Sequence, residues 1–375
     1  MTNTWITFQN VFDGERLHNQ ASVRLEDGYI AELSDTKRGT DQHPGYLVPG
    51  FLDLQVNGGG GVQLNSTPTA NAMVQIANAH RSFGTVGILP TVITDEEAVL
   101  EAAASAALSA QGSRGVLGLH IEGPHLSKMR RGTHKRDFIR PITQRTIEIV
   151  GNLRAANVVV MITLAPEEVS LEDIAALSST GAIVSIGHTD ATAEQIENAV
   201  AAGASCATHL FNAMSPMASR APGAVGGILN CGIHFGIICD GHHVDDRMIS
   251  LALRASTNPD AAFLVSDSMA TVGGPDEFEL YGQKVRLQGG RLINSEGNLA
   301  GAHITQAEGI KRLICEVDIP CERALKMATT VPANVIRRPE LASLIGRPVS
   351  EVVVLSENFD VLDSSFLTPQ FDAAE

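Results

Sequence analysis

The sequence has few cysteines, few aromatic residues and fewer positive than negative charges. Its five cysteines are odd in number and show no Cys-x-x-Cys spacing, which predicts neither a disulfide framework nor a thiolate metal site. Lys and Arg total 27 against 42 Asp and Glu, a net charge of -15. Because such a surface repels phosphate backbones and anionic lipids, we expect neither nucleic acid nor a membrane as the main partner.

Long apolar segments are absent as well. No apolar run approaches about 18 residues, and no basic N-terminal segment is followed by an apolar one. We therefore expect neither a membrane span nor an export signal, and a reducing cytoplasm suits the scattered cysteines. Aromatic residues make up 4% of the chain, whereas glycine occurs 35 times. This composition favours close packing of small residues and many tight turns.

Short apolar runs begin at residue 50 and alternate with helix-like stretches rich in Ala, Glu, Leu and Ile. Continuous apolar strands separated by helices are typical of a parallel sheet covered by helices, and about eight such units close a barrel. We therefore expect an α/β protein with a (β/α)8 TIM-like barrel. The apolar runs are residues 50–56, 84–93, 115–121, 158–164, 182–187, 206–211, 233–239 and 262–265.

Two regions depart from this pattern. Residues 221–227 are rich in Gly and Pro and leave little room for a helix, so we expect one irregular unit in the barrel. Residues 276–298 predict a hairpin after the eighth run, and helical patterns follow at 305–315 and 321–330.

Both ends of the chain have strand-like patterns. Asp13-Gly14 and Asp27-Gly28 separate short apolar runs and are hairpin signals, and residues 349–362 return to a strand-like pattern. We expect residues 1–49 and 345–375 to form one small β-sandwich domain beside a barrel over residues 50–344.

Polar side chains stand where most of the apolar runs stop. In an α/β barrel the carboxyl ends of the strands build the active site, so these residues are candidates for chemistry. Taken singly, a His at a strand end is more often a structural hydrogen-bonding residue than a ligand, and an Asp there can cap a helix. Jointly they converge on one face, which favours a functional site. The residues are Gln55, Asn57, Glu122, His188, His209, Asn212, Asp240, His242, His243 and Asp267.

Glu122, His188 and His209 are the candidate metal ligands. One carboxylate and two imidazoles suit a catalytic Zn²⁺, or alternatively Fe²⁺, with an open position for water. Asp267, at the end of a later strand, would accept a proton from the attacking water and return it to a leaving group. The pattern predicts metal-assisted hydrolysis.

Basic residues gather in one segment of this acidic chain, residues 128–136. A solvated loop explains most of these charges, but a position at the barrel mouth favours an anionic substrate. Arg220 is a further candidate for binding phosphate, because guanidinium is a good bidentate partner for it. No P-loop or dinucleotide-binding glycine pattern follows a strand, so nucleotide binding is not expected.

The chain resembles the amidohydrolase superfamily, and within it the deacetylases of amino-sugar phosphates. The resemblance covers nearly the whole chain. The segments that carry it, in this order, are Pro-Gly-Phe-Leu-Asp at 49–53, His-Ile-Glu-Gly-Pro at 120–124, Thr-Leu-Ala-Pro-Glu at 163–167, Gly-His-Thr at 187–189, Thr-His-Leu-Phe-Asn-Ala-Met at 208–214, Asp-Gly-His-His-Val at 240–244 and Val-Ser-Asp at 265–267.

This resemblance implies hydrolysis of the acetamide of N-acetylglucosamine 6-phosphate, in amino-sugar catabolism, to glucosamine 6-phosphate and acetate. It implies that Glu122, His188 and His209 hold the metal and that Asp267 is the catalytic base and acid. It also implies that His134 polarises the substrate carbonyl or binds a sugar hydroxyl. The implied contacts to the sugar phosphate are His243, Asn212, Ala213 and Arg220.

Two further expectations follow from the resemblance. Arg220 matches an arginine that family members supply from a neighbouring subunit, which implies a homodimer. The superfamily commonly has His-x-His at the end of the first strand to hold a second metal, whereas Gln55 and Asn57 stand there in this chain. Because neutral amides are poor ligands for a borderline metal, we expect one metal per subunit.

Other functions stay open at this point. The substrate could instead be N-acetylgalactosamine 6-phosphate or an N-acyl amino acid. A protein of another class, a metal-holding barrel that only senses a sugar phosphate, would not need a catalytic base, and the presence of Asp267 argues against it.

Overall fold

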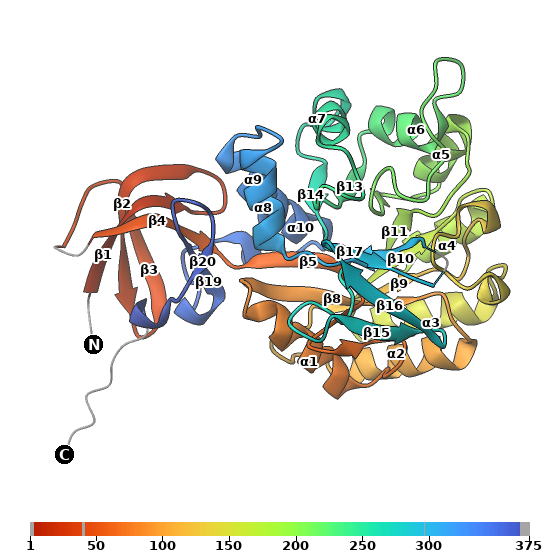
Figure 1. Ribbon diagram of the computed structural model, residues 1–375, viewed down its shortest axis with the longest axis horizontal. Helices are drawn as coiled ribbons and strands as arrows, with labels where there is room; N and C mark the ends of the chain where they lie inside the picture. The colour runs from red at the N-terminus through yellow and green to blue at the C-terminus, as the bar shows by residue number, and fades with distance from the viewer. Residues whose placement is uncertain (1–3, 40–41, 296, 368–375) are drawn as a thin grey trace.

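The computed structural model describes residues 4–39, 42–295 and 297–367. Figure 1 shows an elongated molecule, with a sheet built from both chain ends on one side and a barrel wrapped by helices on the other. The two parts are joined at the first barrel strand, where the Gly50 amide donates to the Glu351 carbonyl oxygen at 2.9 Å.

The terminal sheet has the strand order β20-β19-β4-β1-β2-β3. Strand β19 from the C-terminal part pairs antiparallel with β4, so that Val353 lies opposite Val48. Its buried side chains, Phe8 and Val23 among them, form an apolar cluster of their own. The expected β domain built by both chain ends is therefore confirmed. The strands are β1 (Thr4–Phe12), β2 (Leu17–Glu26), β3 (Tyr29–Ser34), β4 (Gln42–Pro49), β19 (Val352–Leu355) and β20 (Val361–Leu362).

The barrel is an eight-stranded parallel sheet that is nearly closed. Its edge strands meet just past β14, where Val56 bridges to Ser268 and the Asp267 amide donates to the Gln55 carbonyl oxygen at 3.0 Å. Because both faces of such a sheet are covered, its strands are continuous apolar runs, and the eight predicted runs are confirmed. The strands are β5 (Phe51–Val56), β8 (Thr85–Ile93), β9 (Gly118–Glu122), β10 (Val159–Leu164), β11 (Ile183–Ile186), β12 (Cys206–Ala207), β13 (His234–Ile237) and β14 (Ala262–Leu264).

Helices cover the outside of the barrel (Figure 1). Thr192 begins α5 with a capping box to Gln195, and Thr305 begins α8 in the same way with Glu308. The helices are α1 (Ala70–Arg81), α2 (Glu97–Ser109), α3 (Gln144–Ala155), α4 (Leu171–Ser179), α5 (Ala193–Ala201), α6 (Gly223–Cys231), α7 (Asp246–Ala255), α8 (Gln306–Cys315), α9 (Cys321–Ala328) and α10 (Thr330–Val335).

Helix α6 corrects the sequence analysis, which left little room for a helix there. Its glycines permit close packing: a Cβ atom on Gly227 would lie 3.0 Å from the Cβ atom of Ile196 in α5. Ala224 and Ile228 are fully buried on the same helix. Tertiary packing therefore outweighs the low helix propensity of glycine.

The hairpin predicted at 276–298 is only part of what the structure contains there. The region forms a four-stranded antiparallel sheet, which adds a strand beyond the predicted range. Buried Leu280, Val285 and Leu292 pack it against Ile93 and Met269, which lie at the barrel mouth. The strands are β15 (Glu277–Leu280), β16 (Gln283–Gln288), β17 (Arg291–Ile293) and β18 (Leu299–Ala302), and a small pair is formed by β6 (Gly58–Gly59) and β7 (Val62–Gln63).

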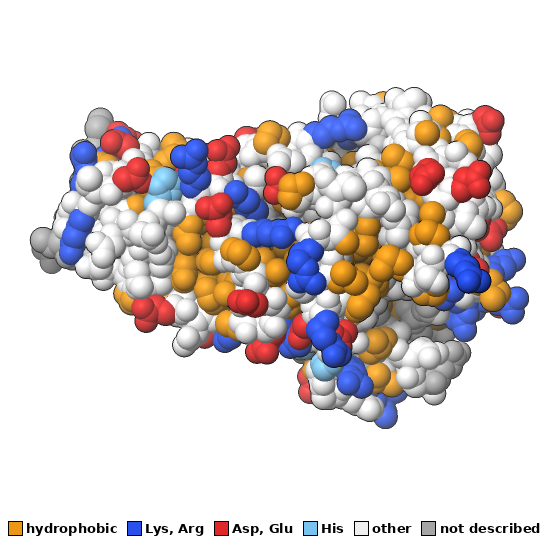
Figure 2. Space-filling view, turned by 90° about the horizontal axis from the view of Figure 1, so that it is seen from above, with side chains coloured by type: hydrophobic (Ala, Val, Ile, Leu, Met, Phe, Trp, Pro, Cys, Tyr) orange, Lys and Arg blue, Asp and Glu red, His pale blue; other side chains and the backbone are white. Residues whose placement is uncertain are grey.

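Figure 2 shows one face of the molecule, on which acidic and basic side chains are interspersed and hydrophobic side chains gather between them. The excess of negative charge is therefore not collected into one acidic area on this face. A search of the described helices finds none with the length and apolar character that crossing a membrane requires.

Candidate active site

The carboxyl ends of the barrel strands surround a cavity of about 170 Å³. Most of the predicted site residues line it. Arg220 is exposed on the loop before α6 and does not, and neither do Gln55, Asp240 and His242. The predicted residues at the cavity are Asn57, Glu122, His134, His188, His209, Asn212, Ala213, His243 and Asp267.

Glu122 is the last residue of β9, and one oxygen of its carboxylate lies close to two imidazoles. Its Oε1 atom lies 3.0 Å from His209 Nε2 and 3.3 Å from His188 Nε2, and the two nitrogens are 3.1 Å apart. Ligand atoms about 2.0–2.1 Å from a tetrahedral Zn²⁺ would be separated by roughly 3.3 Å. The triangle of these three atoms therefore fits one such ion.

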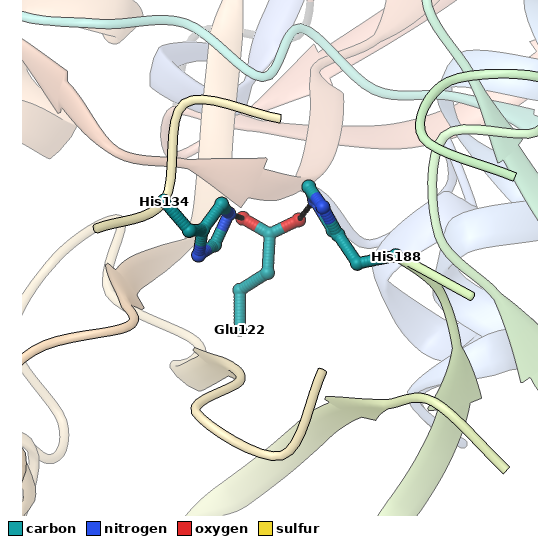
Figure 3. Close-up of side chains that lie close together, drawn as sticks. All are labelled: Glu122, His134 and His188. Carbon is teal, nitrogen blue, oxygen red and sulfur yellow. Dashed lines mark ion pairs between the residues drawn. The ribbon is translucent and has the colours of Figure 1, made fainter. Parts of the chain in front are cut away.

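His134 lies on the other side of Glu122, as Figure 3 shows. Its Nε2 atom is 3.8 Å from Glu122 Oε2. Glu122, His134 and His188 also form a group whose potential ligand atoms all lie within 4.8 Å of one another. The site thus offers two overlapping ligand sets, which share Glu122 and His188 and differ in the third residue.

The protonation of these groups suits metal binding. His188 Nδ1 lies 2.9 Å from the Arg130 carbonyl oxygen, an acceptor, so Nδ1 carries the proton and Nε2 keeps its lone pair for a cation. Burial would raise the pKa of Glu122, but the adjacent imidazoles of His188 and His209 hold it well below its usual range. Glu122 is therefore a carboxylate, the form that a divalent ion requires.

Asp267 is buried beside this group. Its Oδ1 atom accepts hydrogen bonds from Asn57 Nδ2 at 2.6 Å and from Gln55 Nε2 at 3.1 Å. Gln55 Nε2 also donates to Glu122 Oε1 at 2.9 Å, so one amide group bridges the two carboxylates. Burial and then the charge of Glu122 raise the pKa of Asp267 to about 6, which lies in the range of a group that accepts and returns a proton near neutral pH.

Three of the site residues with ionisable side chains have backbone angles that residues other than glycine rarely adopt. His188, His209 and Asp267 have φ values of 47°, 29° and 50°, in the left-handed region that residues other than glycine rarely adopt. Each such residue costs of order 1–3 kcal/mol, and such residues gather at functional sites. The turn after each strand thus aims a side chain into the cavity at the expense of stability.

Two arginines of the basic segment at 128–136 are bonded to other residues of the protein. Arg130 Nε forms a 2.8 Å ion pair with Asp190, and Arg131 Nη1 donates to the His134 carbonyl oxygen at 3.2 Å. The Arg130 carbonyl oxygen in turn accepts from His188. Lys128, Lys135 and Arg136 are exposed, as expected for a solvated loop. The segment therefore supplies cavity residues and backbone contacts, and three of its five cationic side chains face solvent.

Sequence reasoning missed part of the cavity wall. Most of these residues have apolar or small side chains, and none stands at a strand end with a polar group, so the pattern gave no signal for them. Met269 follows Asp267 closely in the chain. The missed lining residues are Ile93, Gly132, Thr133, Met269, Leu299 and Gly301.

Comparison with known proteins adds to this geometry. Residues 46–346 match the sequence profile of the Amidohydrolase family. The N-acetylgalactosamine-6-phosphate deacetylase of Shewanella sp. (strain ANA-3) is 38% identical over 95% of this chain and 94% of its own. The N-acetylglucosamine-6-phosphate deacetylase of Haemophilus influenzae is 32% identical over 88% of both chains. The crystal structure of N-acetylglucosamine-6-phosphate deacetylase from Pasteurella multocida superimposes with a TM-score of 0.88 at 32% identity, covering 96% of this chain and 97% of that one.

Proposed function

Because the chain belongs to the amidohydrolase family, we propose that it hydrolyses the acetamide of N-acetylglucosamine 6-phosphate to glucosamine 6-phosphate and acetate. One observation carries the proposal: Glu122, His188, His209 and Asp267 converge on one cavity, in the arrangement that amide hydrolysis assisted by a metal needs. The names of the relatives support an amino-sugar phosphate as the substrate class.

A second candidate substrate is N-acetylgalactosamine 6-phosphate. The relative that bears this activity in its name is 38% identical to the chain, against 32% for a relative named for the glucosamine compound. The two sugars differ only in the configuration of one ring hydroxyl, so both need the same chemistry at the acetamide. Substrate choice is then a matter of contacts to that hydroxyl.

In the proposed mechanism Glu122, His188 and His209 would hold the metal, which would supply Lewis-acid chemistry for the acetyl carbonyl and for water. Asp267 accepts the proton of the attacking water on its carboxylate and later delivers it to the departing amine. Gln55 and Asn57 hold Asp267 Oδ1, which leaves Oδ2 to carry the proton. Burial lowers the pKa of His134 to about 3, so it acts as a neutral imidazole beside the carbonyl.

Further parts of the proposal concern the cofactor and the assembly. One Zn²⁺ per subunit, with Fe²⁺ as the alternative, suits a set of one carboxylate and two imidazoles. Gln55 and Asn57 occupy the place where a second metal would need stronger ligands. We propose a cytoplasmic homodimer in which Arg220, exposed on its own subunit, reaches the phosphate in the partner's cavity. Residues 1–49 and 345–375 form the small β domain in this scheme, and residues 50–344 form the catalytic barrel of an enzyme of amino-sugar catabolism.

An assay of acetate release tests the proposal. The purified protein, loaded with Zn²⁺, is given each of the two N-acetyl amino-sugar 6-phosphates, unphosphorylated N-acetylglucosamine and an N-acyl amino acid. We expect turnover of a phosphorylated sugar and far less of the other compounds. Binding of the sugar phosphates without acetate release would instead support a sensor, and preference for the N-acyl amino acid would overturn the substrate class.

A further inference from the structure

Asp240 follows strand β13 and is buried behind the wall of the cavity. Its side chain is 5% exposed, and its carboxylate accepts three hydrogen bonds. Oδ1 accepts from the backbone N–H groups of His242 and His243, both at 2.8 Å, and Oδ2 lies 2.6 Å from His243 Nδ1. Among the described residues, the carboxylate is therefore hydrogen-bonded only within its own loop, and its one side-chain partner is His243.

These contacts determine where His243 carries a proton. Burial opposes the ionisation of Asp240, but its hydrogen bonds with His243 hold its pKa at about 2. A carboxylate only accepts hydrogen bonds, so His243 Nδ1 must be the donor. The ring lines the cavity, and among the described residues Nε2 has no hydrogen-bond partner. Nε2 is thus the polar atom that His243 can offer to a ligand.

The composition of the cavity wall makes this atom important for an anionic ligand. Of the described residues that line the cavity, none is Lys or Arg. His188 and His209 belong to the metal group, and His134 Nε2 lies 3.8 Å from Glu122 Oε2 of the same group. His243 is the lining histidine whose Nδ1 is hydrogen-bonded to a carboxylate outside the metal group.

The other charged groups near this pair are already compensated or lie across the cavity. Arg312 of α8 packs against Gly241, where an added Cβ atom would lie 2.4 Å from its guanidinium carbon. Arg312 Nη2 is paired with Asp246 of α7 at 2.6 Å. Asp267 faces His243 from the segment after β14 and interacts with it electrostatically. Asp240 is therefore the carboxylate in direct contact with the His243 ring.

We propose that Asp240 is a positioning residue: its carboxylate accepts the hydrogen bond of His243 Nδ1–H and holds the ring so that Nε2 is presented to the phosphate of the substrate. The inference rests on the proposed function, because it takes a sugar phosphate as the ligand. It gives the single chain a polar side-chain contact for the phosphate inside the cavity, whereas the exposed Arg220 does not line it.

Kinetics of Asp240→Asn, which keeps the shape and removes the charge, provide the main test. We expect KM for the preferred sugar 6-phosphate to rise roughly 10- to 100-fold, the range for a hydrogen bond to a charged group, with kcat within about threefold and metal content unchanged. His243→Asn should raise KM similarly, and adding Asp240→Asn to it should change KM less than about twofold. Asp245→Asn, which removes an exposed carboxylate nearby, is the matched control and should change neither constant.

Two outcomes would overturn the inference. One is a fall in kcat with KM unchanged in Asp240→Asn, and the other is full additivity of the two substitutions. If Asp240→Asn does not fold, two measurements still test the inference. One is the KM of His243→Asn, which should be raised, and the other is the histidine NMR spectrum of the wild-type protein.

Histidine ¹⁵N NMR of the free, metal-loaded wild-type protein, assigned with His243→Asn, needs no substrate. It should show His243 protonated on Nδ1, and a ring protonated only on Nε2 would refute the role of Asp240. Absence of acetate release with the expected NMR result would instead count against the proposed function alone.

Discussion

The Nδ1 atom of His188 lies 2.9 Å from the carbonyl oxygen of Arg130, in the middle of the basic segment. This contact gives the segment a structural role that its charges do not suggest. A backbone acceptor fixes the tautomer of His188 and aims Nε2 at Glu122, 3.3 Å away. The loop that carries His134 into the cavity therefore also orients a metal ligand, and both functions depend on its folded path.

The first prediction distinguishes the two overlapping ligand sets. If Glu122, His188 and His209 hold the metal, His209→Asn should purify with far less than the expected single metal per chain, whereas His134→Asn should keep it and lose turnover. Elemental analysis of both variants and of the wild type measures this. Retention of metal by His209→Asn together with its loss from His134→Asn would assign His134 as the third ligand.

The second prediction concerns the proton carrier. Replacing Asp267 by Asn keeps a side chain of the same shape but removes the group that accepts the proton, so kcat should fall by roughly 10²- to 10⁴-fold. Metal content should stay at the wild-type level, because Asp267 contacts Gln55 and Asn57 in this arrangement. Steady-state kinetics and elemental analysis check both parts, and a variant without metal would move Asp267 into the ligand set.

The sequence predicted the barrel and most of the cavity because both depend on local patterns. Each buried strand is an apolar run, and the polar residue that ends it, such as Glu122 or His188, is visible at once. Helix α6 was missed because its glycines lower helix propensity, while its stability comes from packing against α5.

The wall formed by Met269, Leu299 and Gly301 was beyond sequence reasoning for a different reason. In the sequence, an apolar or small residue that lines a cavity cannot be distinguished from one in the hydrophobic core. The left-handed backbone of His209 and Asp267 was equally hidden, because local preferences oppose it and only the surrounding structure maintains it. The hydrogen bond between Asp240 and His243 is visible only in the structure, although both residues belong to one short sequence motif.

The third prediction concerns how closely two neighbouring barrel strands approach each other. A Cβ atom on Gly118, at the start of the strand that carries Glu122, would lie 2.1 Å from the Val159 carbonyl oxygen. Gly118→Ala should therefore lower the free energy of unfolding by about 2 kcal/mol or more. Gly151→Ala is the matched control, because this helical glycine has only one distant neighbour, at 4.0 Å, and should gain about 0.5–1 kcal/mol. Urea unfolding of both variants gives the comparison, and equal effects would contradict it.

The fourth prediction is a loss of stability in mild acid. His125 is buried and bonded through Nδ1 to the Arg140 carbonyl oxygen at 3.0 Å, and burial lowers its pKa from 6.5 to about 4. Burial does the same to His80. Between those pH values the unfolded chain binds a proton at each position and the folded chain does not. The free energy of unfolding should therefore be fully present above pH 6.5 and fall as the pH drops toward 4.

Two variants separate this effect from general acid sensitivity. His125→Gln removes one of the titrating groups, so its free energy of unfolding should fall less between pH 7 and pH 4.5 than that of the wild type, by up to about 3 kcal/mol. His18 has the opposite sign: burial lowers its pKa, but hydrogen bonds to Asp13 and Asp35 outweigh burial and raise it. Its contribution is greatest below pH 6.5 and is lost as the pH rises through the raised value, so His18→Gln should make the acid loss steeper. Urea unfolding at several pH values gives both slopes, and equal slopes in the three proteins would show that these histidines do not govern the acid response.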